Sequence, residues 1–132
     1  MKSIRHGMLF ALALLVVMAA TSWAQDVPQR KELRRVDLSG APGMEVILSY
    51  LEFKPGDVLP THFHHGIEMG YFLEGGTVEI PGDPTFVIST GAPIMNLRDE
   101  PHDFKVVGDK TIKLISVHIV DKGKPLYDMV KK

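Results

Sequence analysis

The stretch GDVLPTHFHHGIEMGYFLEG, residues 56–75, holds three histidines and a glutamate between His62 and Glu68. His62 and His64 are two residues apart, so both side chains leave the same face of an extended strand. Glu68 follows His64 after three residues, which is enough chain for a turn that brings its carboxylate back over that face. Two imidazoles and a carboxylate on adjacent β-segments predict a partial shell for a divalent metal.

The rest of the chain indicates short strands separated by turns. Segments that alternate in polarity, or are rich in β-branched and aromatic residues, cover residues 32–38, 44–53, 58–64, 68–74, 77–80, 85–89, 93–98, 102–107 and 111–120. The segments between them are rich in glycine, proline and aspartate, as turns require. After residue 24 no segment has a convincing helical period, and residues 126–132 suggest only a short C-terminal turn. This arrangement predicts a single all-β domain, a sandwich or barrel.

The N-terminus has the features of a secretory signal peptide. Lys2 and Arg5 precede an almost unbroken apolar run over residues 8–20, and small residues lie before a cut after Ala24. A membrane anchor is the alternative, but the apolar run is shorter than the ~20 residues of a spanning helix. We therefore expect a periplasmic or secreted protein. Its expected organisation is a signal peptide, a flexible N-terminal arm, a β-barrel and a C-terminal tail, at residues 1–24, 25–31, 32–126 and 127–132.

Composition limits the chemistry and the partners. The chain contains no cysteine, so a metal site must be built from nitrogen and oxygen ligands. The 15 Lys and Arg residues include Lys2 and Arg5, so a chain cut after Ala24 has 13 basic against 16 acidic residues, a formal charge of −3. These charges are interspersed and form no basic block, which argues against nucleic acid as a partner. No membrane contact is expected once the signal peptide is removed.

His102 is the candidate for a further ligand. It begins an expected strand after a turn, and the alternation along that strand puts Phe104 and Val106 on the same side as His102. Because these two residues are apolar, His102 is expected to point into the core. Glu68 is also expected inside, in an apolar segment where a carboxylate is costly unless it is paired or bound to metal.

The remaining candidates have ordinary structural interpretations as well. His65 follows His64 and should therefore face solvent, whereas His118 shares a face with Ile112 and Leu114 and is either a pocket residue or a core histidine. Arg98 is expected in a solvated turn, with contact to an anionic substrate as the alternative. Four large side chains either line a cavity or fill the barrel: Tyr50, Met69, Tyr71 and Met95.

The spacing in residues 56–75 resembles the first motif of the cupin superfamily. Gly56 is followed by five residues, His62-Phe63-His64, three residues, Glu68, six residues and Gly75, so every motif position is filled. The second cupin motif is present only in part, with Gly91 and His102 at its first glycine and its histidine. Its proline, second glycine and asparagine would fall at Leu97, Asp99 and Val106, and all three differ, which implies a differently shaped turn before His102.

The resemblance covers nearly all of residues 33–126 and implies a double-stranded β-helix, or jelly-roll barrel, of a small single-domain cupin. It implies one divalent transition metal, Mn, Fe, Ni, Co, Cu or Zn, held by three histidines and one glutamate. Carried onto this chain, the ligands are His62, His64, Glu68 and His102. Cupins of this kind are often dimers, so a homodimer is also expected.

Two functions fit the sequence. The first is an exported metalloenzyme with dioxygenase-like or related Lewis-acid chemistry on a small oxygenated substrate; His118 and Tyr71 are the candidates for a protein acid or base. No second inward carboxylate is evident, which disfavours a decarboxylase with a dedicated proton donor. The second is a non-catalytic periplasmic module that binds a metal or a small ligand. Fold resemblance does not choose between them.

Overall fold

The computed structural model describes residues 26–131, and every regular element in this range is a β-strand. The strands are β1 Arg30–Asp37, β2 Met44–Phe53, β3 Val58–Phe63, β4 Gly66–Glu74, β5 Gly76–Glu79, β6 Phe86–Ile88, β7 Pro93–Asn96, β8 His102–Val106, β9 Ile112–Asp121 and β10 Asp128–Met129. Within these residues there is no helix that is long and apolar enough to cross a membrane. The expected signal peptide lies outside the described residues.

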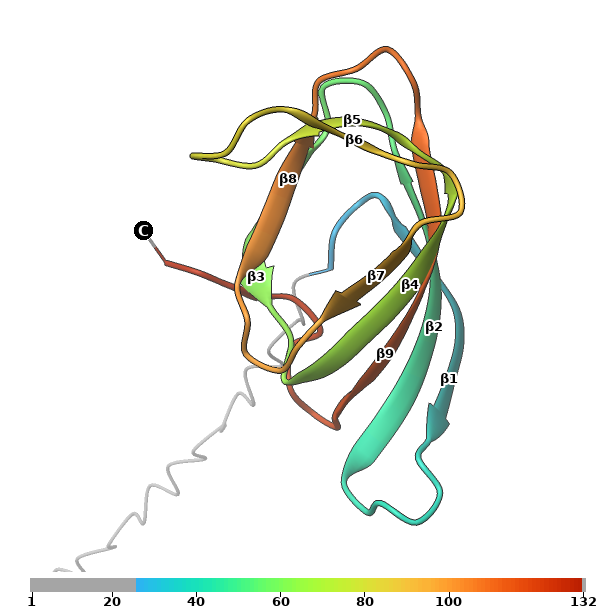
Figure 1. Ribbon diagram of the computed structural model, residues 1–132. Helices are drawn as coiled ribbons and strands as arrows, with labels where there is room; N and C mark the ends of the chain where they lie inside the picture. The colour runs from blue at the N-terminus through green and yellow to red at the C-terminus, as the bar shows by residue number, and fades with distance from the viewer. Residues whose placement is uncertain (1–25, 132) are drawn as a thin grey trace, which may run out of the picture.

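The strands form two five-stranded antiparallel sheets that face each other across the interior (Figure 1). One sheet has the order β1-β2-β9-β4-β7 and the other β10-β3-β8-β5-β6. Strands distant in the chain become neighbours in this arrangement, since β9 lies between β2 and β4 and β8 lies between β3 and β5. The predicted all-β jelly-roll architecture is therefore confirmed.

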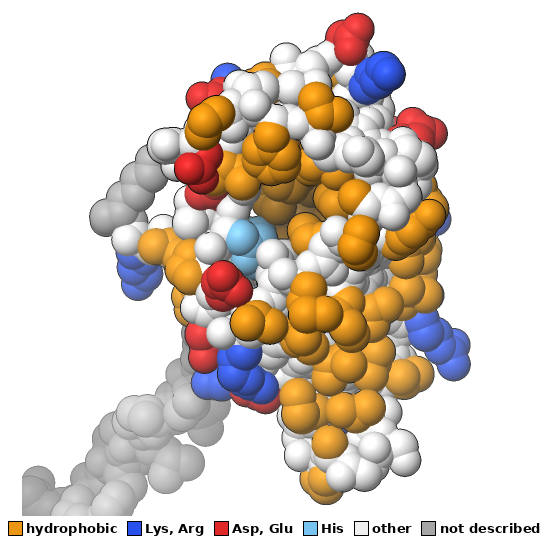
Figure 2. Space-filling model, in the orientation of Figure 1, with side chains coloured by type: hydrophobic (Ala, Val, Ile, Leu, Met, Phe, Trp, Pro, Cys, Tyr) orange, Lys and Arg blue, Asp and Glu red, His pale blue; other side chains and the backbone are white. Residues whose placement is uncertain are grey.

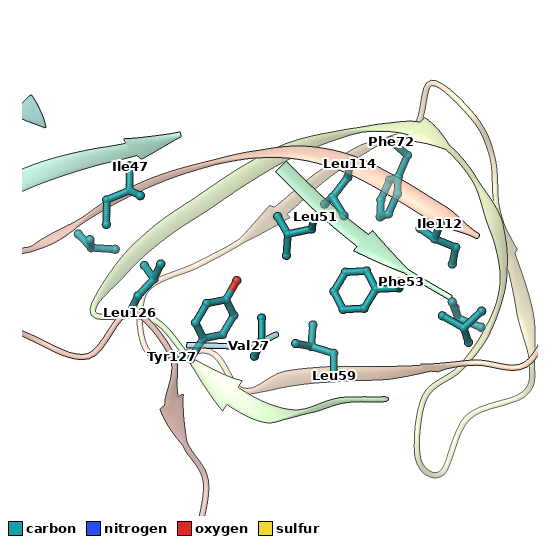
Figure 3. Close-up of a cluster of buried hydrophobic side chains, with 13 residues drawn as sticks. Val27, Ile47, Leu51, Phe53, Leu59, Phe72, Ile112, Leu114, Leu126 and Tyr127 are labelled. Atoms are coloured by element: carbon teal, nitrogen blue, oxygen red, sulfur yellow. The ribbon is translucent and has the colours of Figure 1, made fainter. Parts of the chain in front are cut away.

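Strand alternation builds the core. Along β2 and β9 every second side chain is buried, as expected for strands with one face toward the interior. Figure 3 shows the resulting cluster, in which the rings of Phe53, Phe72 and Tyr127 lie among aliphatic side chains such as Leu51 and Leu114. The expected inward direction of the strand that begins at His102 is confirmed, because Val106 is buried and Phe104 packs against the core.

The two ends of the barrel differ from the sequence expectation. β1 begins at Arg30, two residues before the expected first strand, and Val27 ahead of it is part of the core. At the other end, the expected turn over residues 126–132 is wrong, since Asp128 and Met129 pair with β3 as strand β10. This short strand follows Tyr127, which is buried in the core.

The outer face of the β1-containing sheet is apolar across four strands. Its side chains alternate with the buried ones and include Val46, Leu48, Tyr50, Ile67, Met69, Tyr71, Pro93, Met95, Ile115, Val117 and Ile119. Strand register aligns Leu48, Val117, Met69 and Met95 in one row. Figure 2 shows hydrophobic side chains gathered over the part of the surface where β4, β7 and β9 lie. Tyr50, Met69, Tyr71 and Met95 therefore neither line a cavity nor fill the barrel.

Candidate metal centre

Strand register brings ligand-type side chains from both sheets to one place in the interior. In one sheet His62 of β3 pairs directly with His102 of β8. In the facing sheet Glu68 of β4 pairs with His118 of β9 on one side and with Asn96 of β7 on the other. His64 lies in the short connection between β3 and β4, so it joins the two groups. Pairs that are 28 to 50 residues apart in the chain are thus direct neighbours.

The Glu68 carboxylate contacts three imidazoles, and the fourth, His62, packs against two of them. Glu68 Oε2 is 3.3 Å from His64 Nε2 and 3.5 Å from His102 Nε2, and Glu68 Oε1 is 3.3 Å from His118 Nε2. The His62 ring is centred 4.2 Å from that of His102 and 4.9 Å from that of His64. Two groups have ligand atoms within 4.8 Å of one another, namely His62, His64 and His102, and His64, Glu68 and His118.

The histidine tautomers are set by what the Nδ1 atoms contact. His62 Nδ1 lies 2.7 Å from the Pro60 carbonyl, His64 Nδ1 2.5 Å from the Leu126 carbonyl, and His102 Nδ1 3.0 Å from the Glu100 carbonyl. A carbonyl oxygen only accepts hydrogen bonds, so each Nδ1 carries the proton and donates it. In the neutral ring Nε2 then keeps its lone pair, which is the arrangement found in metal-ligating histidines.

The Nε2 atoms of all four histidines are buried and lack a hydrogen-bond partner among the described residues. A buried polar atom without a partner is costly, and several converging on one point are rare in a folded protein. A divalent ion accepts such lone pairs and removes the cost. The donor set, nitrogen and carboxylate oxygen without thiolate, suits first-row transition metals. The residues present therefore fit the metal that the sequence predicted.

Glu68 is held as an anion by its surroundings. Ser116 Oγ donates to its Oε1 at 2.6 Å and Asn96 Nδ2 donates to its Oε2 at 2.7 Å. Burial alone would raise the pKa of Glu68, but the nearby imidazoles of His102, His64 and His118 lower it well below the usual 4.5. A charged carboxylate inside the barrel is thus already oriented by two hydrogen-bond donors, as a preorganised ligand requires.

The histidines differ in their readiness to take a proton. Burial lowers the pKa of His62 to about 4 and that of His118 to about 3. His102 behaves in the opposite way: burial would lower its pKa, but contact with Glu68 and the bond to the Glu100 carbonyl raise it above 6.5. His62 and His118 therefore stay neutral at physiological pH. At His102, by contrast, protons compete with a metal ion for the Nε2 lone pair.

A cavity of about 450 Å³ adjoins the cluster. His62, Glu68 and His102 form part of its wall, whereas most of the other lining residues are apolar and belong to the core or to β5, β6 and β7. Figure 2 shows a histidine at the floor of a hollow that is rimmed by hydrophobic side chains. The size lies within the ~300–1,000 Å³ typical of small-molecule pockets. The cluster is therefore open to a small ligand from one side.

The structure brings together the four expected ligands His62, His64, Glu68 and His102. Of the two candidate acid–base residues, His118 is fully buried in the cluster behind Glu68 and does not line the cavity. Tyr71 is not at the site, because it lies three residues from Glu68 on the opposite face of β4, with 54% of its surface exposed.

The other two polar candidates also lie away from the cluster. His65 Nε2 contacts Asp128 Oδ2 at 2.9 Å, and Arg98 pairs through both terminal nitrogens with Asp121 at 2.9 and 3.0 Å. His65 thus points away from the cluster, as expected, but it is partly buried against Asp128 rather than free in solvent. Arg98 is engaged at the surface rather than in the cavity.

Three polar residues at the site were not found from the sequence. Asn96 and Ser116 orient Glu68, and Tyr127 lines the cavity with its ring centred 4.7 Å from that of His62. Asp103 follows His102 on β8 and therefore lies on the opposite face of the strand, where its carboxylate accepts a hydrogen bond from the Thr61 hydroxyl. It is thus not a second inward carboxylate. Ser116 was detectable, since it alternates with Leu114 and His118, but Tyr127 comes from a segment that was expected to be a tail.

The turn before His102 is more regular than the altered second motif suggested. Asp99 occupies the position where the motif expects glycine, and its φ of 61° lies in the left-handed region that glycine favours. Aspartate tolerates this conformation better than most residues. The Asp99 amide donates to the His64 carbonyl at 3.0 Å, so the turn also anchors the connection that carries His64.

Solved structures with this fold include enzymes. The polyketide cyclase RemF from Streptomyces resistomycificus is 25% identical, with 80% of this chain and 73% of that chain covered and a TM-score of 0.56. A cupin domain from Bordetella pertussis Tohama I is 15% identical, covering 72% and 97% of the two chains at a TM-score of 0.53. An oxalate oxidase is 20% identical, covering 79% and 57% at a TM-score of 0.52. A search of curated protein sequences finds no match.

The sequence model of the cupin domain family matches residues 49–118. The matched range exceeds half of the chain and contains His62, His64, Glu68 and His102. It extends from the middle of β2 almost to the end of β9, the strands that enclose the cluster. On this family match and on the two-sheet antiparallel fold, the chain belongs to the cupin family, as a small single-domain member.

Proposed function

We propose that this chain is an exported metal-binding cupin that acts as a small metalloenzyme. His62, His64, Glu68 and His102 would hold one divalent transition metal, and the adjoining cavity would take a small oxygenated substrate. The observation that carries the proposal is the convergence of buried, unpartnered Nε2 atoms on an ionised carboxylate. Export is supported by the character of residues 1–24, which resemble a secretory signal peptide.

The chain's own groups suit a dioxygenase-like or related Lewis-acid reaction. Backbone carbonyls orient the three imidazoles, and Ser116 with Asn96 orients the carboxylate, so the ligands need little rearrangement to bind. A divalent ion supplies Lewis acidity and open positions for an oxygen donor. With three neutral imidazoles and one carboxylate the loaded site carries a net charge of +1, which favours an oxygen donor of negative or partly negative character.

A non-catalytic periplasmic module is the alternative. It is favoured by the position of His118, which is buried behind Glu68 and out of reach of a molecule in the cavity. Tyr127 lines the cavity and is the group available for proton transfer in the enzymatic case.

Oxygen consumption separates the two functions. We expect the metal-loaded chain to take up O₂, or to convert substrate without O₂, with at least one member of a panel of catechols, flavonols, diketones and dicarboxylates. An oxygen electrode and product analysis by mass spectrometry measure this outcome. Binding of panel members with no turnover across all six metals would instead establish the module.

Metal affinity is expected to fall as the pH drops through the range in which the histidines take up protons, and to be low below about pH 6. Imidazole binds metal only when it is neutral, and its ordinary pKa is ~6.5. Because contact with Glu68 raises the pKa of His102 and burial lowers that of His62, His102 takes up a proton at higher pH than His62 and opposes metal binding as the pH falls. Metal content after dialysis between pH 8 and pH 4 tests this. Retention that is unchanged at about pH 4 would contradict a histidine shell.

We also propose a second copy of this chain as the partner of the apolar outer face. The row formed by Leu48, Val117, Met69 and Met95 contains no charged side chain, and flat apolar sheet faces of this extent mark interaction sites. Val117→Asp places a charge at its centre and is expected to convert a dimer into monomers in sedimentation velocity experiments. A wild-type chain that sediments as a monomer at about 100 μM would overturn this assignment.

A further inference from the structure

The cavity is a space that the core side chains leave unfilled. Leu51, Phe53 and Leu114 belong to the core cluster, yet they also line the cavity of about 450 Å³. Protein interiors are close-packed and rarely contain voids much larger than a water molecule. A space of this size, with an apolar wall and a few polar groups at one end, is the form of a ligand site rather than of a packing defect.

The charge of the wall excludes one class of ligand. Apart from the histidines, the charged side chain that faces the cavity is Glu68, and no Lys or Arg is among the lining residues. The Asp103 carboxylate lies on the outer face of β8 with Thr61. With a divalent ion bound, the site has a net charge of +1, enough to balance one anionic oxygen. A small dicarboxylate brings two negative charges, so one of them would remain buried without a partner, which is strongly unfavourable.

The wall favours aromatic ligands. Aromatic rings recur along it, at Phe53, Phe72, Phe86, Phe104 and Tyr127. The rings of Phe53 and Phe104 already meet edge to face, with centroids 4.8 Å apart and an interplanar angle of 68°. Such rings pack a further aromatic ring by stacking and edge contacts, beyond the area they bury.

The polar end offers one uncommitted donor. The Tyr127 side chain is 2% exposed, and its hydroxyl has no hydrogen-bond partner among the described residues. Burial raises the pKa of this phenol, so it stays protonated and can donate. Figure 3 shows the hydroxyl directed into the interior rather than toward solvent. Asn96, by contrast, already uses its amide on Glu68.

We propose that the cavity binds a neutral, largely apolar molecule of two or three fused or linked rings that carries an oxygen at one end. The oxygen lies beside His62 and His102 and accepts a hydrogen bond from Tyr127, while the rings pack against Phe53 and Phe72. This assignment rests on the proposed function, because the metal supplies the second contact to the oxygen. A ligand of this kind would distinguish this chain from cupins whose substrate is a small dianion.

Calorimetric titration with 2-naphthol and with oxalate tests the assignment. 2-Naphthol has two rings, one oxygen and no charge at neutral pH. We expect saturable binding of 2-naphthol to the metal-loaded chain and no displacement of it by an equal concentration of oxalate. Displacement by oxalate, or no binding of 2-naphthol to a chain shown to contain metal, would overturn the assignment. Metal content is measured separately, so a metal-free chain that still binds 2-naphthol counts against the metal and not against the cavity.

Three variants locate the binding. Ile94 lines the cavity and Leu97, three residues later, is exposed on the outside, so Ile94→Trp should abolish 2-naphthol binding and Leu97→Trp should leave it unchanged. Both should retain metal. Tyr127→Phe should weaken 2-naphthol by roughly threefold to tenfold, the effect of one hydrogen bond, and leave naphthalene unaffected. Equal binding by Ile94→Trp and the wild type would place the ligand elsewhere.

Discussion

The double variant His62→Ala/His64→Ala is expected to lose its metal. The wild-type chain should purify with about one transition metal, whereas the variant should contain close to none by elemental analysis. Loss of an outer-shell partner alone typically costs 10–100-fold in metal affinity, and this variant removes two direct ligands. Of the two substitutions, His64→Ala is expected to lower the metal affinity more. The His64 ring lies among those of His62, His102 and His118.

Thermal unfolding provides the second measurement of the same loss. A ligand that binds only the folded state stabilises it by about 4 kcal/mol at a thousandfold excess over Kd. For a domain of about 100 residues this raises Tm by roughly 15–30 °C. We expect that shift when at least one of Mn, Fe, Ni, Co, Cu and Zn is added to the wild type after its bound metal has been removed, and none in the variant. A wild type with neither bound metal nor any such shift would refute the metal site.

His65→Ala is the matched control for the double variant. His65 directly follows His64, but its ring contacts Asp128 and lies outside the cluster. Metal content and the metal-induced shift in Tm should therefore equal those of the wild type. If His65→Ala also loses its metal, the effect comes from disturbance of the β3–β4 connection and not from ligand removal.

Gly66→Ala is expected to destabilise the fold by more than about 3 kcal/mol, at the upper end of overpacking effects. A Cβ atom on Gly66 would lie 2.1 Å from the Ile119 carbonyl oxygen and 2.6 Å from the Val120 Cα. Both are backbone atoms of β9, so no side-chain rotation relieves the contact. β9 must move away from β4, which also separates Glu68 from His118 in the register that builds the site. Urea unfolding of the metal-free chain measures the loss.

Gly82→Ala separates this steric effect from backbone strain. Gly82 has a φ of 92°, and a Cβ there meets no atom within 4 Å. The variant should lose only the ~1–2 kcal/mol that a left-handed backbone costs a non-glycine residue. If the two variants lose equal stability, close contact between β4 and β9 is not what requires glycine at position 66.

The parts of the fold that depend on local pattern were predictable from the sequence. Alternation along β2 and β9 identifies the inward faces without any knowledge of the partner strand, because one face of each strand must be buried. The apolar outer face was not recognised, since apolar residues on both faces of a strand give no sign of which face is the core. The positions of Tyr50 and Met95 were misjudged for this reason.

The residues of the site also differ in whether the local sequence predicts that they lie together. His62, His64 and Glu68 lie within seven residues, so their proximity follows from local chain geometry. Asn96, Ser116 and Tyr127 lie 28, 48 and 59 residues after Glu68. Alternation with Leu114 and His118 indicates that Ser116 points inward, but the local sequence does not indicate that the three residues lie at this cluster. Their roles depend on β4 lying between β7 and β9, and on the return of the C-terminal segment to β3.

Residues 56–75 by themselves determine that three ligand-type side chains meet on adjacent strands, because the two-residue period of a strand and a short turn leave few other arrangements. Tertiary structure alone decides what surrounds them. Register between distant strands places His102 opposite His62 and His118 opposite Glu68, and the packing of the two sheets leaves an apolar cavity on one side of the cluster. A one-residue shift in any of these pairings would turn a ligand out of the site, and only the packing of the whole barrel specifies the register.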